Sequence, residues 1–270
     1  MKHKTLRNFS FCAVCLAGMA AKAQAQYTNS YGYTFNNPVS ASCNAASWDG
    51  MNSRLIYRMI LKKHGYTDAQ LGKMSTKEMY DKIEGSDPEA PKKEQAAIVP
   101  ASPASRFKPS GKRVLLPELV KSLTQDAGQQ NSLTQLFESG FESFDKEAKK
   151  NGLSNDLAGS VAFFIGSAYM VYRDGEAPNE DGLLILAHAL QLSFNTPAMR
   201  KIPDLDKQKF HEFMVTMGTY FLVARQTSID QRDAAMAQQI KDAATAILKG
   251  YLKIDPSKFK ITANGLEVSN

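Results

Sequence analysis

The feature that most constrains the fold is the stretch 157–172, LAGSVAFFIGSAYMVY, which is apolar on almost every side. It is shorter than the roughly 20 residues that a helix needs to cross a bilayer. A helix that is hydrophobic all round and does not span a membrane has to be enclosed by other elements. We therefore predict a buried helix at the centre of the main domain, with Ser154 or Asn155 as its N-cap and Asp156 complementing its dipole.

Small residues recur at every fourth position of this stretch, at Ala158, Ala162 and Gly166. They would form a groove that lets a neighbouring helix approach closely. Glycine in a helix interior costs about 1 kcal/mol relative to alanine. Close packing against another helix is therefore our explanation for Gly166.

The segments around this helix have the apolar periodicity of amphipathic helices. One helix would begin at a capping box, Ser132–Gln135, and end at Lys149–Gly152. Pro117 suits the first turn of a short helix before it. The tail, 258–268, is compatible with a short strand or with coil. Further helices are predicted over 179–192 (starting at Asn179 or Glu180), about 204–226 and about 230–253.

The predicted fold class is all-α, a helical bundle of about five main helices with a small N-terminal helical appendage. In the appendage, apolar residues on one face predict a helix over 53–65. Thr67 can cap a short helix through Met74. Ser75–Glu78 is a capping box that would open a helix through Ile83.

Composition divides the chain into five regions. The first residues combine a basic start, an apolar run and small residues at Ala23 and Ala25, which is the pattern of a secretory signal peptide. An N-terminal membrane anchor is the alternative, although an apolar run of about 13 residues is short for a bilayer. The predicted organisation is a signal peptide at 1–25, an irregular arm at 26–50, a small helical segment at 51–85, a Pro-rich linker at 86–112 and a main helical domain at 113–270.

The charge balance argues against one class of partner. The chain has 33 Lys and Arg against 27 Asp and Glu, and four of the basic residues lie in the predicted signal peptide. The remainder is nearly neutral and lacks the clustered basic residues that neutralise phosphates, so we predict no nucleic-acid partner. We expect an exported protein, periplasmic or extracellular, with no transmembrane segment after cleavage. Cys43 would then be the one remaining cysteine, so no disulfide within the chain is expected.

Motifs for catalysis, phosphate binding and dinucleotide binding are absent from the sequence. His211–Glu212 matches the first half of a zinc-binding H-E-x-x-H motif, but Val215 stands where the second histidine is required. The acidic loop 174–182 has the wrong spacing for a calcium-binding EF-hand and would instead be a turn whose acids cap the next helix. We predict no cofactor and no metal. A zinc site formed by spatial convergence of His188 and His211 is the alternative.

Four polar residues near the central helix are the candidates for a catalytic site: Asp156, Tyr172, Arg173 and His188. They flank the ends of that helix or face it. The competing interpretation is that they act as helix caps and salt-bridge partners.

The segments Asn155–Ala158, Ala162–Phe164 and Asp255–Pro256 through Ile261–Leu266 resemble those of a family of uncharacterised exported bacterial proteins. The similarity covers the main domain, about 113–268. No activity is known for that family. The resemblance therefore implies export and a helical domain, and it transfers no functional residues.

These observations favour a non-enzymatic module of the bacterial cell envelope or exterior that binds a protein or another envelope component. The aromatic arm and the Pro-rich linker would suit a tethered module, and an exposed apolar patch on the main domain would support this hypothesis. One alternative is a hydrolase or lyase whose site is assembled from dispersed polar residues. The other is a carrier of an apolar ligand, with Met214, Met217 and Phe221 lining a cavity.

Overall fold

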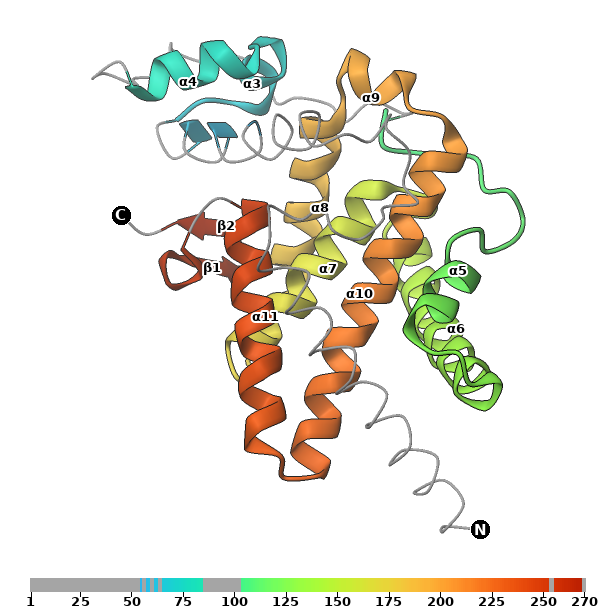
Figure 1. Cartoon of the computed structure of the whole chain (residues 1–270). Coiled ribbons are helices and arrows are strands. Elements are labelled where there is room, and N and C mark those ends of the chain that lie inside the picture. The colour runs from blue at the N-terminus through green and yellow to red at the C-terminus, as the bar shows by residue number, and fades with distance from the viewer. Residues whose placement is uncertain are drawn as a thin grey trace.

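The computed structural model describes residues 54, 57–58, 61–62, 65–84, 103–252 and 255–268 (Figure 1). The predicted signal peptide, the predicted arm and residues 86–102 lie outside the described residues. Within them the chain is mostly helical, and its one sheet is a two-stranded hairpin. The all-α fold class is therefore confirmed.

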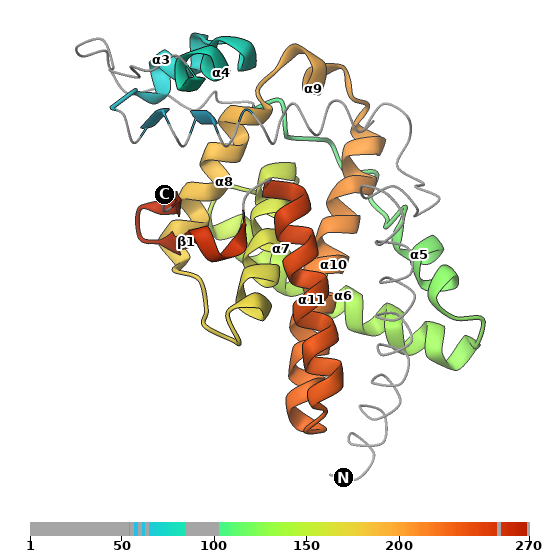
Figure 2. The same cartoon turned by 60° about the vertical axis from the view of Figure 1, so that its left-hand side comes forward.

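Helix α7 (Leu157–Tyr172) is the central buried helix that the sequence predicts. It packs against α8 (Glu180–Phe194), α10 (Asp204–Asp230) and α11 (Ala234–Leu252), which enclose it in both views of the fold (Figures 1 and 2). The N-cap differs from the prediction. Asp156 itself caps α7, because its Oδ1 accepts a hydrogen bond from the Ala158 backbone N–H at 2.9 Å.

The small residues of α7 have the packing role expected of them. A side chain at Gly166 would collide with Leu183 of α8, so the absence of a Cβ sets how closely the two helices approach. Gly218 of α10 has the same role, because a side chain there would collide with the ring of Phe163 of α7. Close packing explains why a glycine is present inside each helix.

Helix α6 (Ala127–Lys150) begins earlier than predicted. Asp126 is its N-cap and accepts from the Gln129 N–H at 2.8 Å, so the predicted capping box at Ser132 is wrong. Ser132 lies inside the helix, where its hydroxyl donates to the Gly128 carbonyl. The preceding helix, α5 (Leu116–Leu123), has Pro117 in its first turn as predicted, and the two lie on the outer side of α10 (Figure 2).

The C-terminal part contains elements that the sequence leaves open. A short helix, α9 (Pro197–Lys201), fills the loop before α10. After the 3-10 turn η2 (Pro256–Lys258), strands β1 (Phe259–Thr262) and β2 (Gly265–Val268) pair antiparallel, with Phe259 opposite Val268. The hairpin packs on α8, and its Phe259 ring lies 5.7 Å from the ring of Tyr169.

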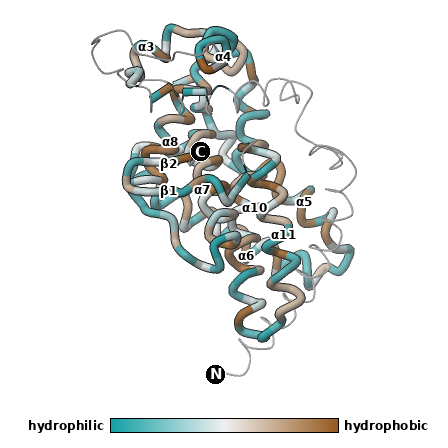
Figure 3. The backbone as a smooth tube through the Cα atoms, turned by 90° about the vertical axis from the view of Figure 1, so that its left-hand side faces the viewer, coloured by the Kyte–Doolittle hydropathy of each residue, from teal (hydrophilic) through white to brown (hydrophobic). Residues whose placement is uncertain are grey.

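Helices α3 (Asp68–Lys73) and α4 (Thr76–Glu84) form part of the small helical segment. Both predicted N-terminal signals are confirmed: Thr67 and Gln70 form a capping box on α3, and Ser75 and Glu78 form one on α4. Both hydrophilic and hydrophobic residues occur on α4 (Figure 3). The apolar side chains here make a separate hydrophobic cluster of Leu61, Tyr66, Leu71 and Met79.

The end of the predicted linker differs from the expectation. Ala104, Ser105 and Phe107 are buried, and Ala104 belongs to the main hydrophobic cluster. Arg106 forms an antiparallel bridge with Asp156, which fixes this stretch beside the start of α7. Part of the segment predicted as linker, from Ala104 to Phe107, therefore packs with the main helices. Over the described residues, no helix combines the length and the apolarity that crossing a membrane requires.

Candidate functional site

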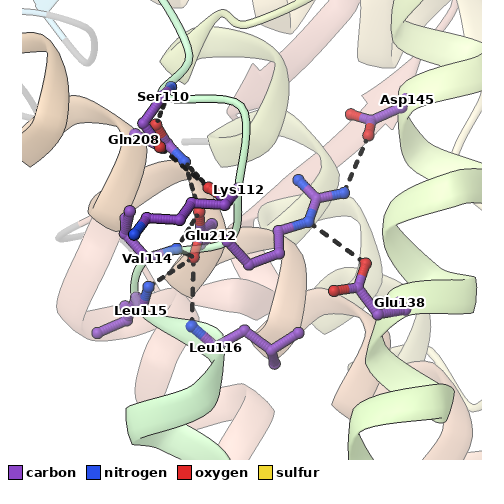
Figure 4. Close-up of polar contacts among 10 residues, drawn as sticks. Ser110, Lys112, Val114, Leu115, Leu116, Glu138, Asp145, Gln208 and Glu212 are labelled. Atoms are coloured by element: carbon purple, nitrogen blue, oxygen red, sulfur yellow. Dashed lines mark hydrogen bonds and ion pairs between the residues drawn. The ribbon is translucent and has the colours of Figure 1, made fainter.

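A buried carboxylate in the middle of α10 caps another helix. The N-cap residue of α5 is Leu115, whose side chain offers no acceptor. The backbone N–H groups of Val114, Leu115 and Leu116 donate instead to Oε2 of Glu212, at 2.9, 2.7 and 3.2 Å (Figure 4). The first amides of a helix lack partners within the helix and carry partial positive charge. They therefore stabilise the charge of a side chain that has 0% exposure.

Gln208 extends the same contact by one helical turn. Its Nε2 donates to the Lys112 carbonyl at 2.6 Å and to Oε1 of Glu212 at 2.8 Å, and its Oε1 accepts from the Ser110 N–H at 2.8 Å (Figure 4). Two side chains of α10 thus hold the backbone of residues 110–116. We call Gln208, Glu212 and this backbone segment the clasp.

Arg113 connects the clasp to α6. Its guanidinium lies over the ring of Phe141, 3.8 Å from the centroid, and pairs with Glu138 at 3.4 Å and Asp145 at 3.2 Å. A cation over an aromatic face is attracted by the ring quadrupole. Residues 110–116 are therefore held from both sides, by α10 and by α6.

Asp156, one of the residues singled out from the sequence, is fully buried and its oxygens have partners. Besides capping α7, it accepts a hydrogen bond from Nε2 of Gln191 at 2.6 Å, and its Oδ2 lies 3.7 Å from Nε of Arg106. It joins the start of α7 to α8 and to the 103–107 segment. These contacts make Asp156 a structural group.

His211 lies beside the clasp within a cage of aromatic rings. The rings of Phe107, Phe141 and Phe144 have centroids 5.2, 6.5 and 5.4 Å from its own. Burial, reinforced by the charge of Arg113, lowers the pKa of His211 to about 3, against an opposing effect of the Asp156 carbonyl. The imidazole is therefore neutral near pH 7. Among the described residues, its Nδ1 has no hydrogen-bond partner.

A different polar site opens at the other end of α7. A surface cavity of about 390 Å³ is lined by Tyr172, Arg173, Asp174, Glu176 and Lys241. We call these five residues the pocket. Four come from the end of α7 and the turn behind it, and Lys241 comes from α11.

The turn in the pocket is held by backbone hydrogen bonds, by two ion pairs and by a hydrogen bond from Arg225. Asp174 and Gly175 have φ angles of 54° and 99°, and Arg225 of α10 donates to the Asp174 carbonyl at 2.9 Å. Lys241 Nζ contacts both carboxylate oxygens of Asp174 at 2.8 and 2.9 Å. Arg173 pairs with Glu176 at 2.7 Å. Both pairs hold the turn in one geometry.

The four candidate catalytic residues predicted from the sequence lie in different parts of the structure. Tyr172 and Arg173 share the pocket. Asp156 lies at the opposite end of α7, a distance of about 24 Å at 1.5 Å rise per residue. His188 lies on α8, one turn before Gln191, and is half-buried. The four residues therefore do not form one site.

Sequence comparison places the chain in a family. A model described as a family of unknown function, DUF6683, matches residues 4–269. The chain belongs to this family. No curated protein and no solved structure matches it. The resemblance to an uncharacterised family is thus confirmed, whereas export and a bacterial source remain predictions.

In this DUF6683 protein the polar groups that sequence reasoning missed are Gln208, Glu212 and Lys241. The spacing of Gln208 and Glu212 places them on one face of α10, but a helical spacing does not indicate which backbone they hold. Acids of the 174–182 loop were expected to cap α8. Asn179 performs that role, accepting from the Gly182 N–H at 3.0 Å, while Asp174 and Glu176 belong to the pocket. In the described ranges, no three His, Cys, Asp or Glu side chains form a group that could hold a metal ion.

Proposed function

We propose that this protein is a non-enzymatic binding module of the bacterial cell envelope or exterior, and that it binds a polar envelope component in the pocket. The cavity of about 390 Å³ at the end of α7 carries this proposal. Small-molecule sites typically measure about 300–1,000 Å³ and are largely pre-formed. The two ion pairs around the turn already orient the side chains that line this cavity.

Binding is favoured over catalysis because the buried polar residues outside the pocket are enclosed by the protein. Glu212 and Asp156 are enclosed and already accept hydrogen bonds from neighbouring groups. His211 is neutral and has 3% exposure, so it is not available as a general acid or base. These groups therefore do not favour the hydrolase or lyase alternative.

The ligand is expected to be polar because the exposed apolar residues are dispersed. Among the large hydrophobic residues that the structure describes, Leu205 and Ile229 are the most exposed, at 49% each, and they lie near opposite ends of α10. The stripe proposed for an apolar carrier lies within the main hydrophobic cluster, where Phe221 contacts Phe164 with ring centroids 6.2 Å apart. Within the described part of the chain, Tyr80 and Ile185 are the other exposed large hydrophobic residues.

Export is tested directly by the mass of the secreted protein. We expect cleavage after Ala25, which gives a chain that begins at Gln26. Intact-mass spectrometry of the protein recovered outside the cytoplasm would measure this. Recovery of the full-length chain from the cytoplasmic fraction would contradict the localisation.

Envelope binding is tested by sedimenting the purified protein with the envelope fraction of the cells that produce it. The pocket variant is Tyr172→Ala combined with Lys241→Ala, and the control is Lys249→Ala, which changes a lysine of α11 outside the pocket. We expect the pocket variant to lose retention and the control to keep it. Equal retention of the two variants would overturn the proposal.

A further inference from the structure

We propose that the pocket takes an uncharged, hydroxyl-rich ligand of the saccharide class. This inference rests on the proposed function and specifies the ligand of the same site. It follows from three features of the pocket: its charge balance, the outward position of its carboxylates and the environment of Tyr172.

The four charged side chains that line the pocket form two ion pairs, and behind the turn the guanidinium of Arg225 donates to the Asp174 carbonyl. Arg173 pairs with Glu176 at 2.7 Å, and Lys241 pairs with Asp174 at 2.8 Å. A ligand with a net charge would be attracted by one member of each pair and repelled by the other. Net attraction therefore favours neither an anion nor a cation, whereas hydrogen bonds remain possible to both members.

The carboxylates face solvent more than the cations do. The side chains of Asp174 and Glu176 are 76% and 60% exposed, whereas those of Lys241 and Arg173 are 33% and 32% exposed. The accessible surface of the pocket thus offers acceptor oxygens, each with a donor group behind it. Adjacent hydroxyls of a sugar ring both donate and accept, so they match this arrangement of alternating acceptors and donors.

Tyr172 supplies an apolar surface and a polar hydroxyl group. Its half-buried ring packs against the main hydrophobic cluster. The same residue lines the pocket. An amphipathic aromatic residue of this kind suits a ligand that has C–H groups on one face and hydroxyls at its rim.

The experiment uses three probes that share one pyranose ring: glucose, glucosamine, which is cationic, and glucuronate, which is anionic. Binding to the full secreted chain is measured by isothermal titration calorimetry and by amide chemical-shift changes. A ligand of this size should bind with Kd of about 1–10 mM. We expect both charged probes to bind roughly threefold more weakly than glucose, because the paired side chains offer no net charge to compensate for the hydration that a charged group loses.

Two conservative variants locate the binding. Asp174→Asn preserves the left-handed turn, which asparagine adopts readily, and Lys241→Met preserves the apolar stem of the lysine. Both should abolish the glucose-induced shifts, whereas the control Lys249→Met should leave them unchanged. Thermal melting confirms that each variant is folded.

The outcomes separate the ligand class from the proposed function. Tighter binding of glucosamine or glucuronate than of glucose would overturn the saccharide class but keep a ligand site in the pocket. If none of the three probes binds while envelope retention still depends on the pocket, the class is again overturned and the function stands. If neither the probes nor the envelope fraction binds in a pocket-dependent way, both proposals fail.

Discussion

The clasp and the pocket use the same kinds of side chain in opposite environments. In the clasp, Glu212 has no exposure, and both of its oxygens accept hydrogen bonds from the chain itself. In the pocket, Asp174 is 76% exposed and its carboxylate faces solvent beyond its ion pair with Lys241. A buried carboxylate has to be satisfied internally, so it contributes to the structure. An exposed one keeps acceptor sites for a ligand.

The largest difference between the two regions should appear when a carboxylate is removed. Glu212→Leu leaves the amides of Val114, Leu115 and Leu116 without an acceptor inside the protein. We expect the free energy of unfolding to fall by about 3–5 kcal/mol, as measured by urea denaturation. The control is Glu147→Ala, which removes an exposed pair with Lys150 and should cost less than about 1 kcal/mol. Similar losses for the two variants would mean that the clasp is not a structural unit.

The second test concerns pH, because the clasp region contains a neutral buried histidine. The pKa of His211 is about 3 in the folded protein, against about 6.5 in the unfolded chain. Above pH 6.5 both states are neutral at this residue, so it contributes no pH dependence. As the pH falls below 6.5, the unfolded state binds a proton that the folded state does not bind until about pH 3, and stability is lost. The loss should reach about 3 kcal/mol at pH 4.

This pH dependence is isolated by comparison with His211→Gln. The difference between wild type and variant should be constant above pH 7 and should shift by about 3 kcal/mol in favour of the variant between pH 7 and pH 4. Urea denaturation at each pH provides the measurement. A constant difference over the whole range would show that the imidazole is solvated in the native state.

The fold could be predicted where local sequence determines structure. Helix α7 follows from an apolar run that has to be enclosed, and the caps at Thr67 and Ser75 follow from short-range hydrogen bonds. The start of α6 was missed because Ser132 satisfies a capping pattern within a segment that continues as helix from Ala127. The capping pattern at Ser132 therefore lies inside a longer helix, whose N-cap is Asp126.

The members of the clasp and of the pocket were harder to predict because they depend on long-range contacts. Glu212 is separated from Leu115 by 97 residues, and Lys241 from Asp174 by 67. Tyr172 and Arg173, which line the pocket, could be named from the sequence because they end a recognisable helix. No local pattern indicates that a lysine of α11 contacts the turn behind α7. The contribution of Lys241 to the pocket could therefore be seen only in the structure.

The turn of the pocket should depend on Gly175. Its φ of 99° is unfavourable for other residues, and a Cβ there would collide with the guanidinium of Arg225. We expect Gly175→Ala to lower the free energy of unfolding by about 2 kcal/mol and to weaken ligand binding. The matched control is Gly250→Ala in α11, where a Cβ would meet no atom within 4 Å and would increase helix propensity. That variant should gain about 0.5 kcal/mol, and urea denaturation distinguishes the two.

The smallest effect on stability should come from the pocket charges themselves. Lys241→Met removes a partly exposed ion pair with Asp174, and such pairs contribute between about 0 and 1 kcal/mol. We therefore expect its urea midpoint to stay close to that of wild type while binding in the pocket is lost. Glu212→Leu should show a large loss of stability, with ligand binding retained as long as the chain is folded. If Lys241→Met destabilised the protein as strongly as Glu212→Leu, the pocket would be a second structural clasp, and its charges would not be available to a ligand.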